Sequence, residues 1–126
     1  MSATLPNMSD PRRAASGLTR IVGGHALVRV RGRSMAPTLA DGDLLLVRVG
    51  APPTPQSLVV VRLPGRPGLA VKRAIRREPE GWWVERDSRR EGVDSWAVGA
   101  VPDQDVVARV VARPWPARRI GHPPAL

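Results

Sequence analysis

Short runs of apolar and β-branched residues alternate with segments rich in proline and glycine along most of this chain. The runs predict strands at residues 26–31, 43–49, 58–63, 69–76, 82–86 and 106–113. The segments between them carry Pro, Gly or Asp, which favour turns and loops. The sequence shows no heptads, no internal repeat and no amphipathic helical period, so we expect a mainly β fold of short strands.

Two of the predicted strands are expected to form a hairpin. The turn residues 78–81 separate the runs 69–76 and 82–86, and residues 87–102 are expected to form a loop. Adjacent side chains point to opposite faces of a strand, so Trp82 and Trp83 cannot share one environment. We expect one of them to be buried and the other to cover a sheet edge.

The length of 126 residues fits one domain with a substantial core. Residues 1–20 lack periodicity and any long apolar run, so we expect them to form a disordered tail, with a single domain at 21–126. The apolar stretch 21–30 is interrupted by two glycines, a histidine and an arginine, which is not typical of a secretory signal. No run is long enough to span a membrane, so we expect a soluble protein without an integral membrane segment.

The composition narrows the function classes. The absence of cysteine excludes disulfides, thiol catalysis and thiolate metal sites, and it fits a cytoplasmic location. The net charge of +9 raises the question of nucleic-acid binding. However, the basic residues are scattered, no recognised DNA-binding motif is present, and Phe and Tyr are absent, so we expect no nucleic-acid partner. The positive charge would also attract an acidic protein substrate.

Ser34 is the first candidate for catalysis. Pro37 restricts the backbone around it, and the turn formed by Asp41, Gly42 and Asp43 precedes an apolar run, so Ser34 lies on constrained backbone between two predicted strands. A serine hydroxyl is a poor nucleophile unless a base lies within hydrogen-bonding reach. The search for function therefore becomes a search for that base.

Lys72 is the candidate base. It is the only lysine among the 20 Lys and Arg residues, and it lies in an apolar predicted strand, where it alternates with Ala70 and Ala74. Lysine, unlike arginine, can lose its proton at workable pH when it is desolvated. An alternative interpretation is that Lys72 is an ordinary surface lysine on an edge strand.

Other combinations of candidate catalytic or metal-binding residues are less well supported by the sequence. A Ser/His/carboxylate triad would need His25 or His122, and neither lies in a recognisable catalytic setting. Two isolated histidines without cysteine do not make a structural zinc site, and we expect no cofactor and no metal. Asp41 and Asp43 flank Gly42 and are best explained as turn residues.

Two blocks of the sequence resemble those of the signal peptidase I family. The first is Ser34-Met35-Ala36-Pro37-Thr38-Leu39 followed by Gly42-Asp43, and the second is Val71-Lys72-Arg73, 38 residues after the serine. The same blocks occur more loosely in the self-cleaving LexA-type repressors. The resemblance implies a signal-peptidase/LexA-like catalytic fold of short antiparallel strands and coiled sheets, with a Ser/Lys dyad.

Within this group the chain is most similar to the small proteases that mature nickel-type superoxide dismutase. The segments 81–85, 94–95 and 99–102 carry that likeness. It implies a serine endopeptidase that removes an N-terminal leader from a precursor protein and needs no metal itself. Two alternatives stay open, namely a LexA-type self-cleaving regulator and a catalytically inactive binding module of the same fold.

The resemblance also implies roles for individual residues. Ser34 would be the nucleophile and Lys72 the base, and Met35 would line the main specificity pocket. The backbone N–H of Ser34, with a second donor near Gly32, would hold the oxyanion.

The chain departs from the family in its third block. Arg86 stands where the family has glycine, Gly92 where it has the serine that orients the lysine, and Trp96 where it has the arginine that pairs with Asp94. Three residues are therefore candidates for orienting the lysine: Ser88, Asp94 and Ser95.

Overall fold

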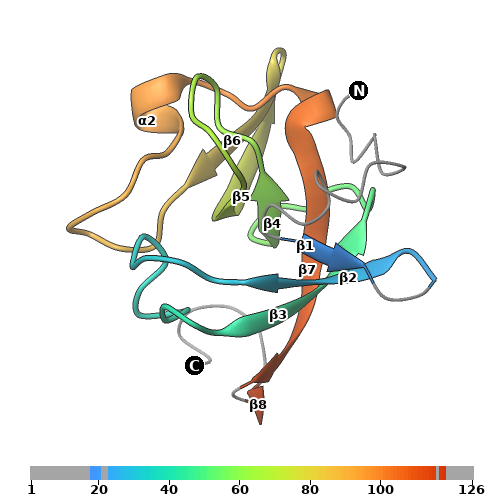
Figure 1. The fold of residues 1–126 in the computed structure, drawn as a ribbon. Helices are drawn as coiled ribbons and strands as arrows, with labels where there is room; N and C mark the ends of the chain where they lie inside the picture. Colours follow the sequence, from blue (N-terminus) through green and yellow to red (C-terminus); the bar gives the residue numbers. More distant parts are fainter. Residues whose placement is uncertain (1–17, 21–22, 116, 119–126) are drawn as a thin grey trace.

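The computed structural model describes residues 18–20, 23–115 and 117–118, and shows a mainly β protein (Figure 1). Its strands are β1 (Leu18–Arg20), β2 (His25–Arg29), β3 (Leu44–Val49), β4 (Leu58–Val61), β5 (Ala70–Glu78), β6 (Gly81–Glu85), β7 (Val106–Trp115) and β8 (Ala117–Arg118). Helical structure in the described part is confined to α2 (Ser95–Val98) and the 3-10 turn η2 (Asp103–Asp105). The expected mainly β fold class is confirmed.

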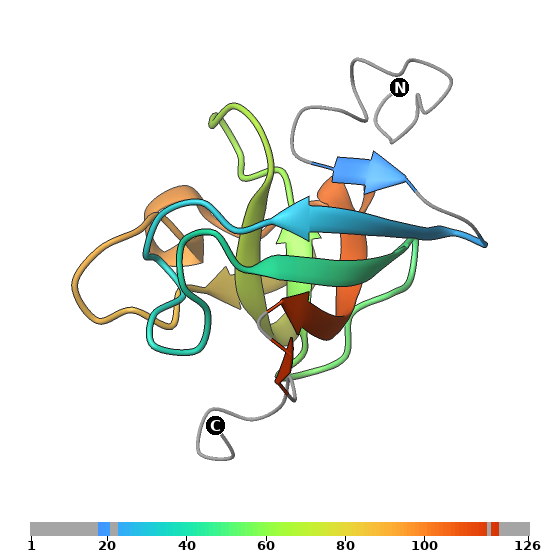
Figure 2. The ribbon, with the colours of Figure 1, turned by 60° about the horizontal axis from the view of Figure 1, so that its bottom comes forward.

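The strands pair in the order β1-β2-β3-β7-β4-β5-β6, and β8 pairs with β7. Every pairing is antiparallel. β1, β2 and β3 run side by side (Figure 2), and β4, β5 and β6 form a second meander. The long strand β7 joins the two meanders, and register shifts interrupt its pairing with both β3 and β4. Such irregularities let strands bend and twist.

Two apolar clusters lie on opposite faces of β4. Leu58 and Val60 belong to the cluster that includes the buried residues of β2 and β3, whereas Val59 and Val61 belong to a second cluster beneath β6. All four residues of β4 are buried. The two-residue side-chain period of a strand explains this division, because consecutive residues face opposite sides.

The prediction that residues 18–20 belong to a disordered tail is wrong. These residues form β1 and pair with β2. The reason is burial, because Leu18 is only 1% exposed and packs in the first cluster. Residues 1–17 lie outside the described part of the chain.

The predicted hairpin is confirmed, because β5 and β6 pair from Arg73↔Glu85 to Glu78↔Gly81. Trp82 is buried, whereas Trp83 is half-buried, and the guanidinium of Arg76 lies over its ring at 4.9 Å. The two tryptophans thus differ as expected.

Two segments are more regular than predicted. The expected loop at 87–102 contains α2, because the Asp94 carboxylate accepts a hydrogen bond from the Trp96 backbone N–H and caps the helix. The strand predicted at 106–113 is longer than expected, because β7 continues to Trp115, and β8 pairs with it at Arg113↔Arg118 and Pro114↔Ala117.

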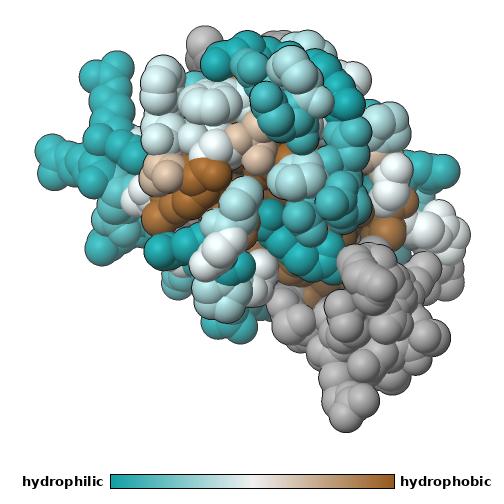
Figure 3. Space-filling view, turned by 90° about the horizontal axis from the view of Figure 1, so that it is seen from above, coloured by the Kyte–Doolittle hydropathy of each residue, from teal (hydrophilic) through white to brown (hydrophobic). Residues whose placement is uncertain are grey.

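The face seen in Figure 3 is largely hydrophilic, with hydrophobic residues visible in hollows between the polar ones. Among the described residues, no helix is long and apolar enough to cross a membrane.

Candidate active site

Ser34 lies in the turn between β2 and β3. The Leu39 N–H donates to the Met35 carbonyl at 2.9 Å, and the Ala36 N–H donates to the Arg33 carbonyl at 3.1 Å. The carbonyl of Ser34 itself accepts a hydrogen bond of 2.9 Å from the backbone N–H of Ser88. The serine is therefore held both by its own turn and by the loop that follows β6.

Lys72 is the third residue of β5 and lies opposite Val59 of β4. Only 3% of the residue is exposed. Its face of the strand carries the small residues Ala70 and Ala74, which pack with the second apolar cluster. The alternation seen in the sequence thus places the ammonium group against apolar surface, and the interpretation of Lys72 as a surface residue is wrong.

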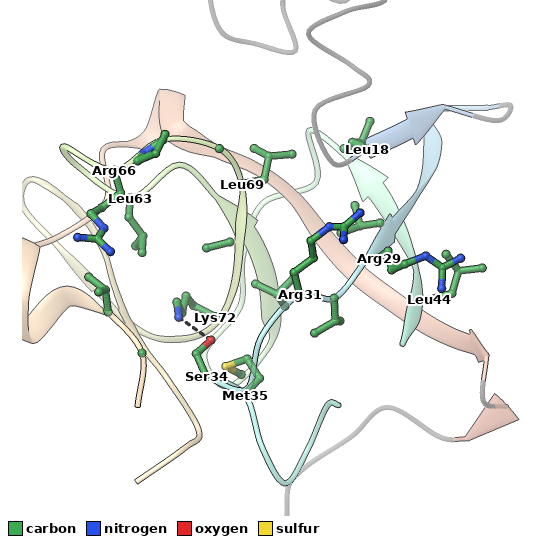
Figure 4. Close-up of a pocket in the computed structure, with 18 of the residues that line it drawn as sticks. Leu18, Arg29, Arg31, Ser34, Met35, Leu44, Leu63, Arg66, Leu69 and Lys72 are labelled. Carbon is green, nitrogen blue, oxygen red and sulfur yellow. Dashed lines mark hydrogen bonds between the residues drawn. The ribbon is translucent and has the colours of Figure 1, made fainter. Parts of the chain in front are cut away.

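The two side chains meet, because the Nζ of Lys72 donates to the Oγ of Ser34 at 2.8 Å (Figure 4). Burial lowers the pKa of Lys72, and the positive charge of Arg86 lowers it further, whereas the carboxylate of Asp94 opposes both effects. A desolvated lysine in contact with a serine hydroxyl has the geometry of a nucleophile and its general base.

The dyad opens into a cavity of about 950 Å³ between the β4–β5 loop and β2. Apolar side chains line it, among them Leu63 and Leu69 of the β4–β5 loop and Leu18 of β1 (Figure 4). Three arginines also line the cavity, whereas Asp and Glu are absent from its described lining; the arginines are Arg29, Arg31 and Arg66. The cavity lined by Ser34 is therefore partly apolar and positively charged.

Asp87 links the serine turn to the lysine strand. Its carboxylate accepts two hydrogen bonds from the guanidinium of Arg73, at 3.1 and 2.7 Å, and one from the hydroxyl of Thr38, at 2.6 Å. Its backbone N–H approaches the sulfur of Met35 at 3.4 Å. Arg73 and Thr38 are each 3% exposed. This ionic anchor fixes the residue after Lys72 to the turn that carries Ser34.

The roles of Arg73, Thr38 and Asp87 were not predicted from the sequence, although one signal for them is present. Arg73 follows Lys72 in an apolar strand with Val71 and Ile75 on its own face. A buried guanidinium needs a carboxylate partner. The sequence could have predicted that a partner exists, but not which aspartate supplies it.

The three residues considered for orienting the lysine all bond to the backbone. The hydroxyl of Ser95 accepts from the Val84 N–H at 2.9 Å. That of Ser88 accepts from the N–H groups of Arg90 and Glu91, at 3.1 and 3.2 Å. In the described structure none of these hydroxyls is hydrogen-bonded to Lys72.

Asp94 acts on Lys72 through its charge. Its carboxylate is buried and accepts hydrogen bonds from the backbone N–H groups of Arg86, at 3.0 Å, and Trp96, at 3.1 Å. The Trp96 side chain turns outward, where its indole N–H donates to Glu85 at 3.1 Å and its ring meets that of Trp83 edge-on at 5.2 Å. Backbone donors thus bind Asp94, for which the resembling family supplies an arginine.

The loop formed by residues 86–94 packs directly on the nucleophile. A Cβ built on Gly92 would lie only 2.5 Å from the Cβ of Ser34, and φ of Gly92 is +120°. The Arg86 side chain crosses this loop, donating from Nε to the Ser88 carbonyl at 2.8 Å and from its terminal nitrogen to the Gly92 carbonyl at 3.2 Å. Arg86 and Gly92, which both differ from the residues of the resembling family, are therefore structurally linked, because the Arg86 side chain binds the Gly92 carbonyl.

Met35 and Gly32, the two residues expected at the substrate pocket and the oxyanion site, differ in what the structure shows. Met35 is buried and lines the cavity beside the serine. The Gly32 N–H, by contrast, donates to the side chain of Asp41 at 2.7 Å, so that amide is already used. Among the described residues, the Ser34 N–H has no protein acceptor.

Among the described residues, nothing supports a Ser/His/carboxylate triad. His25 lies at the start of β2, where its Nδ1 is 3.2 Å from the Gly23 carbonyl, and it does not line the cavity. His122 lies outside the described residues. Asp41 and Asp43 serve the turn, as expected, because they accept hydrogen bonds from Gly32 and Ala40. The part of the chain that the structure describes holds no group of three or more potential metal ligands.

Comparison with known proteins agrees with this geometry. A search of curated proteins finds no significant match. A family model described as Peptidase S24-like matches residues 6–90, which is more than half of the chain and includes both Ser34 and Lys72. The chain therefore belongs to the Peptidase S24-like family.

Proposed function

We propose that this protein is a serine endopeptidase in which Ser34 is the nucleophile and Lys72 the general base. The observation that carries the proposal is the 2.8 Å contact between Nζ and Oγ in the lining of a cavity of about 950 Å³. Family membership supports a peptidase but does not by itself establish activity.

The mechanism follows from the environment of Lys72. Burial favours the neutral amine, which can accept a proton from the Ser34 hydroxyl across the existing contact. The alkoxide oxygen attacks the substrate carbonyl carbon, and the resulting ammonium returns the proton to the leaving amine as the acyl-enzyme forms. Lys72 then takes a proton from water, whose oxygen attacks the ester carbonyl carbon, and the ammonium gives that proton to the Ser34 Oγ as the ester C–O bond breaks.

The oxyanion needs donors in place before the reaction. The backbone N–H of Ser34 suits this role because it has no acceptor among the described residues. Since the Gly32 N–H is bound to Asp41, the second donor would come from another group, including water or the substrate.

The substrate we propose is an N-terminal leader of a precursor protein, namely that of a nickel-type superoxide dismutase. The resemblance of the 81–85 and 99–102 segments supports this choice. The cavity adds a preference of its own, because its described lining contains arginine but no carboxylate. A cleavage region that carries acidic side chains would therefore be bound best.

The direct test is cleavage of a nickel superoxide dismutase precursor, read by mass spectrometry, with wild type, Ser34→Ala and Lys72→Arg. Lys72→Arg keeps the charge but cannot become neutral, so it tests the base alone. We expect one cleavage by wild type and none by either variant. An intact precursor across a range of pH would rule out this substrate, and activity in Lys72→Arg would rule out the mechanism.

A second candidate is a self-cleaving regulator. The match to the Peptidase S24-like family favours it, because the resembling LexA-type repressors share both blocks. It predicts cleavage of the protein's own chain at alkaline pH, at a rate independent of protein concentration, and no cleavage in Ser34→Ala. If Ser34 instead resists every acylating reagent, the protein is an inactive binding module of this fold.

A further inference from the structure

The side chain of Arg86 joins the two points at which the 86–94 loop contacts Ser34. The contact of the loop with the nucleophile consists of the Ser88 N–H, which donates to the Ser34 carbonyl at 2.9 Å, and the backbone of Gly92, which packs on the Ser34 side chain. Gly92 and Ser88 stand four residues apart, and the Arg86 guanidinium donates to the carbonyls of both. The guanidinium thus links the two points at which the loop touches Ser34.

We propose that Arg86 is a positioning residue for the Ser34–Lys72 pair, which holds the 86–94 loop against the nucleophile and places a fixed positive charge on the loop that packs on the dyad. This inference rests on the proposed function. It concerns a residue that departs from the resembling family, in which a glycine at this position could supply neither the hydrogen bonds nor the charge.

The geometry explains why arginine suits this position. The Arg86 backbone N–H donates to the buried carboxylate of Asp94, so the main chain at residue 86 is fixed. Its planar side chain presents several donors in a rigid fork, which suits two carbonyls on one loop. A lysine would offer one compact ammonium group and could not hold both carbonyls in the same way.

The charge acts in the same direction as burial. Arg86 lowers the pKa of Lys72, and Asp94, whose carboxylate raises it, is the opposing group. Arg73, the next residue in β5, is paired with Asp87, and Arg31 and Arg66 line the same cavity. A general base must be unprotonated to accept a proton. A nearby positive charge disfavours the protonated ammonium form of Lys72 and therefore favours the neutral amine, which is the active form.

The lone lysine makes a direct test possible without any substrate. Protein labelled with ¹³C and ¹⁵N in lysine gives a single side-chain signal, that of Lys72, which NMR can follow through a pH titration. We expect Arg86→Gln to raise the pKa of Lys72 relative to wild type. We also expect the Ser88 amide to exchange with solvent about tenfold faster, as for the loss of about one hydrogen bond.

Arg89→Gln is the matched control, because Arg89 is exposed on the same loop and the change removes the same charge. It should leave both the Lys72 titration and the Ser88 exchange as in wild type. Arg86→Met, which keeps part of the aliphatic stem, provides a second variant if Arg86→Gln is poorly folded.

Two results would overturn the proposal. One is an unchanged Lys72 titration and Ser88 exchange in a folded Arg86 variant. The other is an equal change in Arg89→Gln, which would mean that only net charge matters. Neither readout requires peptidase activity, so a failure of the proposed function would be seen separately, as a wild-type protein whose Ser34 is not acylated.

Discussion

Gly92 and Ser34 approach so closely that a Cβ on the glycine would lie 2.5 Å from the Cβ of the serine. Real Cβ contacts are essentially never this short, so any side chain at residue 92 must displace one of the two segments. The resembling family has a serine here that orients the lysine. In this protein, contact between the loop and the nucleophile has taken the space that such a serine would occupy.

Restoring the family residue should therefore impair the site. We expect Gly92→Ser to slow acylation of Ser34 by a serine-directed reagent by about tenfold to a hundredfold, because a shift of about 1 Å in a reacting group has effects of that size. Faster acylation in Gly92→Ser would show that the missing serine limits the enzyme.

The control for this variant is Gly50→Ser. Gly50 also has a positive φ, of +80°, but no heavy atom lies within 4 Å of a Cβ built there. We expect it to share the backbone strain of the Gly92 variant and to lose about 1 kcal/mol of stability, while acylation of Ser34 stays as in wild type.

The lowered pKa of Lys72 makes stability depend on pH. Between its folded pKa and its ordinary value, the unfolded chain binds more protons than the folded one, so folding stability rises with pH through this window. Below the folded pKa the penalty for burying the charge is fully present. Lys72→Met, which has no charge to bury, should therefore be more stable than wild type near neutral pH.

Urea unfolding at a series of pH values would measure this effect. The advantage of Lys72→Met should shrink as the pH rises toward the ordinary lysine pKa. A difference between the two proteins that is constant with pH would contradict a lowered lysine pKa.

Arg113 and Asp43 form a buried ion pair beneath the serine turn. Their side chains are 4% and 7% exposed, and one guanidinium nitrogen donates to both the Asp43 carboxylate and the Thr38 carbonyl, at 3.0 Å each. We expect Arg113→Met to lose about 3–5 kcal/mol of unfolding free energy, because it leaves the aspartate charge buried without its partner.

Adding Asp43→Asn to that variant should recover part of the loss, because the stranded charge is then gone. Arg77→Met, which breaks the exposed pair with Asp103, should leave stability nearly unchanged. An equally small loss for Arg113→Met in chemical denaturation would show that this buried pair does not hold the turn.

The arginines of the cavity should set a charge preference. Arg31 and Arg66 are exposed and lie on different walls, one just before the serine turn and the other in the β4–β5 loop (Figure 4). We expect Arg31→Glu with Arg66→Glu to reduce the kcat/KM ratio of an aspartate-containing peptide to its asparagine analogue by about tenfold at low salt, and less as salt screens the charges.

Arg48→Glu is the control for charge alone, because Arg48 is exposed on β3 and does not line the cavity. It should change the peptide ratio little. If the double variant keeps the wild-type ratio of kcat/KM for the two peptides, the cavity arginines do not set a preference for acidic segments.

Local features of this protein can be predicted from the amino-acid sequence alone. Alternating apolar residues predicted β2 to β7 to within a few residues, because the side-chain period of a strand is a local property. The Ser34 block and the single lysine identified the two residues that now lie 2.8 Å apart. The apolar strand around Lys72 made burial one of two interpretations, and the structure decided for it, because only 3% of the residue is exposed.

Contacts between segments that are distant in the sequence became visible only in the folded protein. The pairing of Arg73 with Asp87, the contact of Gly92 with Ser34 and the bonds of Arg86 to its own loop depend on how the strand order brings β5, β6 and the serine turn together. Leu18 became a core residue for the same reason. Such contacts depend on the shape of the whole sheet, and a close approach that requires glycine has no signature in the sequence beyond the glycine itself.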